Sequence, residues 1–157
     1  MRFLRMNIMM RSYSEVLSLP TFEERLVYLL CNGIVSDETF GTLRWMNQEL
    51  YKSPEWLEFR KQIILRDECC DLAHPDYPLD GYYDKALNKV INTNRISVHH
   101  INPLLPEDLV NNSRRIFDPE NVITVSGQTH RYIHYGIPGA PPTIVERVPN
   151  DTCSWRR

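Results

Sequence analysis

The pattern of apolar and polar positions in the first third of the chain predicts two helices. Residues 21–31 begin with a capping box, formed by Thr21 and Glu24, and continue as an apolar run with helical period. A second helix is expected from an N-cap at Ser36 to about Lys52, although a glycine lies inside it. The beginning of the chain therefore has the pattern of a helical extension.

A third helix has the clearest pattern in this half of the chain. Ser53 is placed to cap it, and Pro54 suits the first helical position, where no amide hydrogen is needed. Four apolar residues then form one stripe along the helix: Trp56, Phe59, Ile63 and Ile64.

The second half of the chain predicts strands separated by loops, and a final helix. Residues 69–95 are rich in Pro, Asp, Asn and Gly and are expected to be a loop with a hairpin or a short helical piece. After them we expect the strand "RISVHHI", a long surface loop over 102–121, the strand "VITV", and a helix from the N-cap Ser126 to Gly136. The order is strand, loop, strand, helix, which gives an α+β fold.

Length and composition are those of one globular domain with an extension. The chain has 157 residues, ordinary apolar content and a net charge of −2. That charge argues against a protein that coats nucleic acid by bulk electrostatics, so any DNA contact must come from local basic patches. Four cysteines are too few for a disulfide framework, which favours a reducing cytoplasm. Polar residues interrupt the apolar start of the chain, and no run is long enough to span a membrane. We therefore expect a soluble protein without a signal peptide or a membrane partner.

The histidines carry the candidate chemistry. His130 and His134 are four residues apart on the last predicted helix, so both imidazoles share one face, as two ligands of one metal do. If the strand with His99 packs on this helix, three nitrogens can converge on one ion and leave a coordination position open for catalysis. His100 would then lie beside the metal as a base.

Less specific interpretations exist for the same residues. A histidine on a helix is usually an ordinary core or surface residue, and the i, i+4 pair alone is weak evidence of a metal site. A zinc protease would need Glu directly after the first helix histidine, and Arg131 occupies that position. The combination with the neighbouring pair His99 and His100 is what favours a metal centre.

Three separated motifs resemble the His-Asn-His (HNH) endonuclease family. They are "VHHINPL", "FDPENVITVS" and "THRYIHYG", and they occur in the family's order. The resemblance extends over about residues 54–136, and from "FEERLVYLLCNG" onward the chain is similar to small HNH proteins of bacteriophages. It implies a ββα-metal (His-Me finger) nuclease core, with a helical extension at 1–53, the nuclease domain at 54–140 and a tail at 141–157. The implied location is the cytoplasm of a bacterial host cell.

The resemblance also implies a role for each motif residue. His99, His130 and His134 match the metal ligands, and His100 matches the general base. Asn121 matches the motif asparagine, whose amide would bind backbone groups across the loop and hold His100 in orientation. Because adjacent side chains of a regular strand point to opposite faces, we expect the backbone at His99 and His100 to be irregular.

The chain departs from the family pattern where many members bind a structural zinc. In place of two Cys-x-x-Cys pairs it has Cys70 with Ala73, and Ser126 with Thr129, so no structural zinc is expected. We expect the missing stability to come from packing of the preceding helix against the core, through Trp56, Phe59 and Leu65.

Metal identity and DNA contacts are less narrowly defined. His99 stands where many relatives have Asp, and an all-nitrogen ligand set shifts preference from Mg²⁺ toward Zn²⁺, Ni²⁺ or Mn²⁺. Phosphate contacts are expected from four arginines: Arg95, Arg131, Arg114 and Arg115. The leading interpretation is a DNA endonuclease with one divalent ion. The alternative is a metal-stabilised DNA-binding module, or a phage assembly or packaging module, without catalysis.

Overall fold

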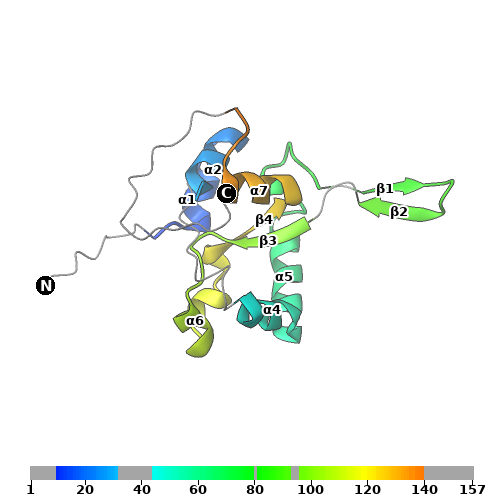
Figure 1. Cartoon of the computed structure of the whole chain (residues 1–157). Coiled ribbons are helices and arrows are strands. Elements are labelled where there is room, and N and C mark those ends of the chain that lie inside the picture. The colour runs from blue at the N-terminus through cyan, green and yellow to red at the C-terminus, as the bar shows by residue number, and fades with distance from the viewer. Residues whose placement is uncertain (1–9, 32–43, 80, 93–95, 140–157) are drawn as a thin grey trace, which may run out of the picture.

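The protein has a mixed α+β fold (Figure 1). The computed structural model describes residues 10–31, 44–79, 81–92 and 96–139. The described helices, including the short 3-10 helices η1 to η3, and the strands are α1 (Tyr13–Ser18), α2 (Phe22–Leu29), α4 (Arg44–Lys52), α5 (Pro54–Arg66), η1 (Asp71–Ala73), β1 (Gly81–Asp84), β2 (Lys89–Asn92), β3 (Ile96–His100), α6 (Pro106–Val110), η2 (Arg114–Ile116), η3 (Pro119–Asn121), β4 (Val122–Ser126) and α7 (Gly127–Tyr135). Among these helices, none combines the length and apolar character that crossing a membrane requires.

The predicted helices of the first half are confirmed where the structure describes them. The capping box of α2 is formed in both directions between Thr21 and Glu24, and Ser53 caps α5 by accepting a hydrogen bond from the Trp56 amide. Helix α4 ends at Lys52 as expected, but the proposed N-cap Ser36 lies outside the described residues. Helix α1, which the pattern did not predict, is a short helix capped by Ser12.

The segment between α5 and β3 contains both of the alternatives that its sequence left open. The short helix η1 is followed by an antiparallel hairpin of β1 and β2, with Asp84 opposite Lys89 beside the turn. The hairpin extends away from the rest of the protein (Figure 1).

Strands β3 and β4 form the antiparallel pair at the centre of the fold. His99 is opposite Ile123 and His100 is opposite Val122, so both histidines belong to the regular ladder. The expectation of an irregular backbone at this point was therefore wrong. Normal alternation sends His99 toward α7 on one face of the sheet and His100 toward α5 on the other.

The connection from β3 to β4 is more ordered than the long surface loop that the sequence predicted. It contains the short helix α6 and the 3-10 helices η2 and η3. Its prolines misled the prediction, because Pro106 and Pro119 occupy first helical positions, where proline is favourable. Asp108 closes the start of α6 by accepting a hydrogen bond from the Leu105 amide at 2.8 Å.

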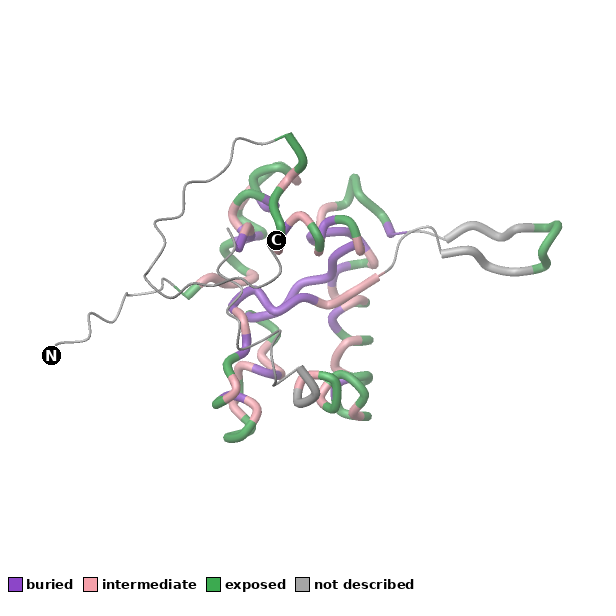
Figure 2. Tube along the Cα trace, in the orientation of Figure 1, coloured by how far each residue is buried: buried purple, intermediate pink, exposed green. Residues whose placement is uncertain are grey.

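The main hydrophobic core lies between the central sheet and the helices α1, α2 and α7 (Figure 2). Val16 and Leu29 from the N-terminal helices are fully buried, and they join Ile123 of β4 and Ile133 of α7 in one cluster. The described part of the predicted extension therefore shares a core with the strands and helix that carry the histidine motifs.

The opposite face of the sheet is covered by α5. Trp56 and Ile63 are buried there, and Phe59 packs edge-on against Phe117 at a ring distance of 5.5 Å. Packing of Leu65 was predicted wrongly, since its side chain is 68% exposed. Residues 63–65 are all apolar, but each step along a helix turns by about 100°, so Ile63 faces the sheet and Leu65 faces away.

Buried polar groups join α5 to the sheet and to α1. The Asp67 carboxylate accepts hydrogen bonds from the Thr124 amide at 2.8 Å and from the Tyr13 hydroxyl at 2.9 Å. Arg66 binds the same carboxylate and donates to the Val122 carbonyl at 2.9 Å. Burial, and then the Asp67 charge, raise the pKa of Tyr13 to about 12, so its hydroxyl remains a donor at neutral pH.

Alanine substitutions on α5 should separate its two faces. Ile63→Ala should lower the free energy of unfolding by about 2–4 kcal/mol, because it leaves a cavity against the sheet. Leu65→Ala should change it by less than about 0.5 kcal/mol, because that side chain is in solvent. Urea unfolding of both variants measures the difference. Equal losses would contradict the orientation of α5 described here.

Candidate metal centre

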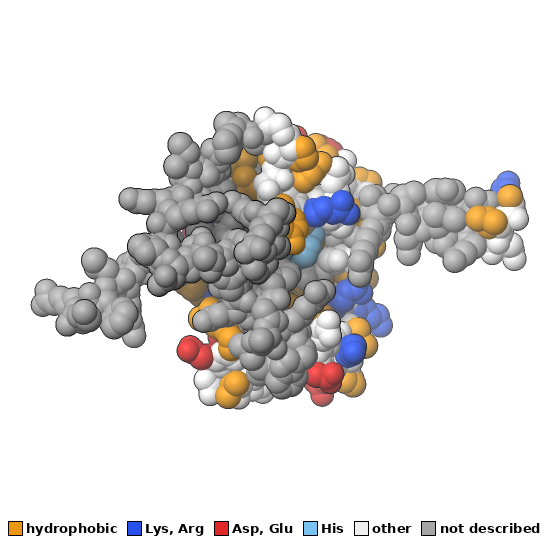
Figure 3. Space-filling view, viewed as in Figure 1, with side chains coloured by type: hydrophobic (Ala, Val, Ile, Leu, Met, Phe, Trp, Pro, Cys, Tyr) orange, Lys and Arg blue, Asp and Glu red, His pale blue; other side chains and the backbone are white. Residues whose placement is uncertain are grey.

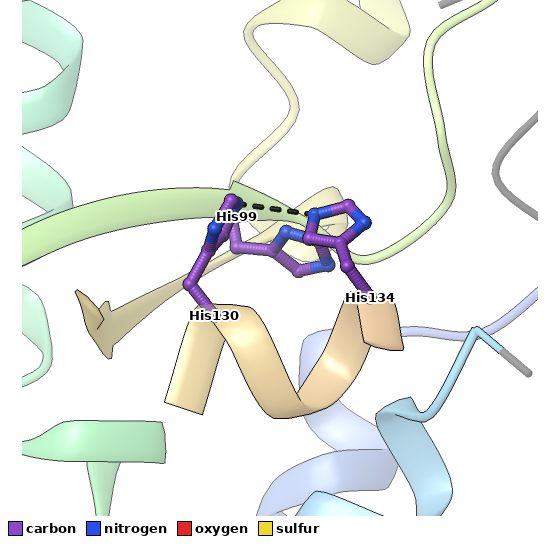
Figure 4. A group of neighbouring side chains, drawn as sticks. All are labelled: His99, His130 and His134. Carbon is purple, nitrogen blue, oxygen red and sulfur yellow. Dashed lines mark hydrogen bonds between the residues drawn. The ribbon is translucent and has the colours of Figure 1, made fainter. Parts of the chain in front are cut away.

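Three histidine side chains from two elements meet at one point (Figure 4). His99 comes from β3, and His130 and His134 come from consecutive turns of α7. Each histidine contributes one ring nitrogen, and these three nitrogen atoms all lie within 4.8 Å of one another. Such a group can hold a metal ion. The rings stand edge-on to one another, with His99 5.3 Å from His130 and 5.1 Å from His134 between centroids.

Local sequence fixes the helix that carries two of these histidines. Ser126 caps α7 by accepting a hydrogen bond from the Thr129 amide at 3.0 Å. At the other end Gly136 has a φ of 87°, which a side chain would disfavour, and its amide donates to the Tyr132 carbonyl. Ile133, between the two histidines in the sequence, is buried in the core, so one face of α7 anchors the helix while the neighbouring face presents His130 and His134.

The positions of the nitrogen atoms fit a metal ion. The Nε2 atoms of His130 and His134 are 3.1 Å apart. For metal–nitrogen bonds of about 2.05 Å, this separation corresponds to an N–metal–N angle of about 98°, between octahedral and tetrahedral values. Nε2 of His99 is buried and has no hydrogen-bond partner among the described residues. A buried polar atom without a partner is unfavourable, and a metal bond would remove that penalty.

Electrostatics keep the ligands in the form that binds metal. Burial, and then the neighbouring His134 and His130, hold the pKa of His99 well below its ordinary value. Burial and then His130 lower the pKa of His134 to about 4. These two imidazoles are therefore neutral at pH 7, which is the charge state that metal coordination requires.

His100 lies on the other face of the sheet in a separate environment. It is 6% exposed and stacks on Trp56 at a ring distance of 5.1 Å. Its Nε2 is 3.0 Å from the Ile116 carbonyl oxygen, which can only accept a hydrogen bond, so Nε2 carries the proton. Burial lowers the pKa of His100 to about 4. The ring is thus neutral at pH 7, with its basic lone pair on Nδ1.

Asn121 fastens the ends of the β3–β4 connection to each other. Its Oδ1 accepts hydrogen bonds from the amide and the side chain of Asn102, at 3.0 and 2.8 Å. Its Nδ2 donates to the Arg115 carbonyl at 3.0 Å, next to the Ile116 carbonyl that holds His100. The hydrogen bonds of Asn121 therefore affect the orientation of His100 through the backbone at Arg115 and Ile116.

The four arginines expected to contact DNA have different environments. Arg131 follows His130 on α7 and is exposed, and Arg114 is also exposed. Arg115 is bound within the loop, 3.3 Å from Asp108 and 3.4 Å from the Pro103 carbonyl. Arg95 lies outside the described residues. Figure 3 shows a histidine side chain at the surface beside Lys or Arg and hydrophobic side chains.

His74, the fifth histidine, does not belong to the group of clustered histidines. Its Nε2 lies 3.2 Å from the Pro20 carbonyl, and its ring packs edge-on against Phe22 and Tyr77. It provides a natural control for substitutions of the clustered histidines.

Several residues that shape the site were not found from the sequence. Arg11 donates to the Ile101 and Tyr28 carbonyls at 3.1 Å, and its amide and carbonyl both bond to the Asn102 side chain. Asp71 binds Ser126 and Thr129 at the start of α7. These contacts join residues far apart in the chain, so no local sequence pattern predicts them. Only Asn102, inside the "HHINPL" motif, had a position that could have suggested a role.

The chain matches no protein-family model, no curated protein and no solved structure. The functional interpretation therefore depends on the geometry of the site itself.

Metal binding should depend on the clustered histidines and not on His74. The protein is expected to bind one Co²⁺ or Zn²⁺, with a rise in Tm of about 5–10 °C at saturating metal. His130→Ala should weaken binding more than about 100-fold, because loss of an outer partner alone already costs about 10–100-fold. His74→Ala should bind like the wild type. Calorimetric titration measures both, and weak binding in the His74 variant would contradict the assignment.

Acid should destabilise the metal-free protein through His100. Its folded-state pKa of about 4 lies below the ordinary 6.5, so between these values the unfolded chain binds a proton that the folded chain does not. Stability is therefore lost as pH falls from 6.5 to 4, by about 3 kcal/mol for this group. His100→Gln, whose amide can donate to the Ile116 carbonyl, should lose less over the same range. Urea unfolding in EDTA at several pH values provides the test, and parallel profiles would contradict it.

Proposed function

We propose that this protein is a metal-dependent DNA endonuclease of the HNH type, which hydrolyses phosphodiester bonds with one divalent ion. The observation that carries the proposal is the convergence of His99, His130 and His134 from β3 and α7. A neutral His100 follows His99 in the sequence and lies on the other face of β3. The order of β3, connection, β4 and α7 is that of a ββα-metal core, which supports the same proposal.

The three clustered histidines would hold the metal. When bound, the ion would supply Lewis-acid stabilisation of the charge that develops on the phosphate oxygens. The ligand group contains no carboxylate, and all-nitrogen ligation favours Zn²⁺, Ni²⁺ or Mn²⁺ over Mg²⁺.

His100 would act as the general base. With the proton of its ring fixed on Nε2 by the Ile116 carbonyl, Nδ1 is the atom that can accept a proton from the attacking water. Its lowered pKa leaves it unprotonated at neutral pH, and a phosphate anion in the site would raise that pKa toward a more effective value. The stack on Trp56 limits rotation of the ring.

Asn121 would act as a positioning residue for this base. By binding the Arg115 carbonyl it fixes the backbone beside the Ile116 carbonyl, and by binding Asn102 it ties that backbone to the end of β3. The carbonyl that orients His100 is therefore held at a constant distance from the strand that carries His100.

DNA contacts would come from exposed arginines. Arg131 follows a ligand directly on α7, which suits contact with a phosphate beside the cleaved bond, and Arg114 offers a second contact. We assign Arg115 to the loop because Asp108 binds its guanidinium. The chain's net charge of −2 means that such local contacts would determine affinity. With the resemblance to phage proteins, this activity would belong in a bacterial host cell.

One observation favours a second candidate, a metal-stabilised DNA-binding or phage assembly module without catalysis. His100 is buried and stacked on Trp56 on the face of the sheet opposite to the clustered ligands, and a histidine that only stabilises the core would have the same environment. The experiment below distinguishes the two candidates.

Plasmid nicking should depend on both the metal and His100. Wild-type protein is expected to cut supercoiled DNA with Mn²⁺, Ni²⁺ or Zn²⁺, less with Mg²⁺, and not with EDTA. His100→Gln should reduce the rate about 10²–10⁴-fold, because the amide side chain cannot take up the proton. Gel analysis of nicked and linear plasmid over time measures the rate.

The choice of glutamine keeps this experiment interpretable. Alanine at position 100 would leave a cavity beside Trp56 and destabilise the protein under either candidate, whereas glutamine fills space and can still donate to the Ile116 carbonyl. Metal affinity of His100→Gln should equal that of the wild type. If the wild type binds metal but cuts DNA no faster than this variant, the endonuclease is excluded and the binding module remains.

A further inference from the structure

A buried carboxylate joins η1 to the beginning of α7. Asp71 is only 6% exposed, and its two oxygens have different partners. Oδ1 accepts a hydrogen bond from the Ser126 amide at 3.0 Å, and Oδ2 accepts one from the Thr129 hydroxyl at 2.6 Å. The described residues include no Lys or Arg side chain in an ion pair with it. Ser126 and Thr129 are two of the positions where the resemblance would place a structural zinc.

The hydroxyls at this contact form a directed chain. The Thr129 amide donates to the Ser126 hydroxyl oxygen, the Ser126 hydroxyl donates to the Thr129 hydroxyl oxygen, and the Thr129 hydroxyl donates to Asp71, with the first two contacts at 3.0 Å. Each hydroxyl accepts once and donates once, so every donor in the chain has an acceptor. A carboxylate suits its end, because it accepts hydrogen bonds without donating any.

The segment that carries Asp71 is rigidly held. Four residues around it, none of them glycine, have left-handed backbone, with φ between 51° and 56°: Glu68, Cys69, Leu72 and Ala73. Each such residue costs about 1–2 kcal/mol, so the surrounding contacts must impose this conformation. Arg25, itself buried, donates from Nη1 to the Leu72 and Ala73 carbonyls at 3.0 Å, and thereby fastens η1 to α2.

Thr129 directly precedes the ligand His130, so this contact bears on the metal centre. Ile133 anchors the middle of α7 in the core, and one anchor alone would let the helix tilt or turn about it. A turn by one residue would move the ligands by about 100° around the helix axis. Asp71 supplies a second anchor at the first turn, and the two together fix the direction of His130 and His134 toward His99.

We infer that Asp71 is a positioning residue for the metal centre, which it serves by fixing the N-terminal turn of α7 through Ser126 and Thr129. The inference rests on the proposed metal centre and is independent of the proposed nuclease activity.

The test compares matched threonine substitutions by Co²⁺ titration, followed through the visible d–d band. Thr129→Val removes the hydroxyl that binds Asp71 and should weaken Co²⁺ affinity about 10–100-fold and alter the band, as loss of an outer partner does. Thr129→Ser restores the hydroxyl and should restore both. Thr124→Val is the control, since the fully buried Thr124 hydroxyl has no partner among the described residues. It should bind Co²⁺ like the wild type.

Substitutions of Asp71 test the same contact independently, in case Thr129→Val fails to fold. Asp71→Asn can still accept one of the two hydrogen bonds but leaves one donor of the chain without an acceptor, so its loss of Co²⁺ affinity should be smaller than that of Asp71→Ala, which should lose affinity as Thr129→Val does. Unchanged affinity and band in Thr129→Val, or equal losses in the Asn and Ala variants, would overturn the inference while the metal centre stands. Failure of the wild type to bind Co²⁺ would overturn both.

Discussion

The antiparallel pairing of β3 with β4 is the constraint on which the arrangement of the site depends. Because the ladder continues through His99 and His100, alternation assigns the two histidines to different faces. One joins two imidazoles of α7, and the other is enclosed by α5 and the loop that returns to β4. A slip of one residue in register would exchange these environments, so the network at Asn102 and Asn121, which closes the end of the ladder, stabilises the placement of both histidines as well as the fold.

Local signals in the sequence were enough to predict the elements that carry the site. The capping box of α2, the serine and proline at the start of α5, and the β-branched run of β3 each specify structure within a few residues. Prediction failed where several local solutions were compatible with the sequence. Three successive apolar residues at 63–65 do not say which one faces the sheet, and a proline in a connection can begin a short helix as readily as prevent one.

The same limit applies to the candidate site. Spacing alone suggested that His130 and His134 share a face, and the structure brings His99 to them. The residues that pack around the histidines and hold their backbone come from distant parts of the chain. Arg11 reaches Ile101, Trp56 covers His100, and Asp71 binds Thr129. Each of these contacts spans more than forty residues, and nothing in the neighbouring sequence distinguishes the partner from other polar or aromatic residues of the same type.

The closure of the β3–β4 connection by Asn102 and Asn121 also has a consequence for how such a protein can diverge. The side-chain oxygen and amide of Asn121 form hydrogen bonds with Asn102, at the other end of the connection, and with the Arg115 carbonyl. The exposed turn at Asn111 and Asn112 takes no part in these hydrogen bonds. Insertions and new sequences can accumulate at this turn without shifting the register of either histidine. Natural variation at this turn would leave the placement of His99 and His100 unchanged.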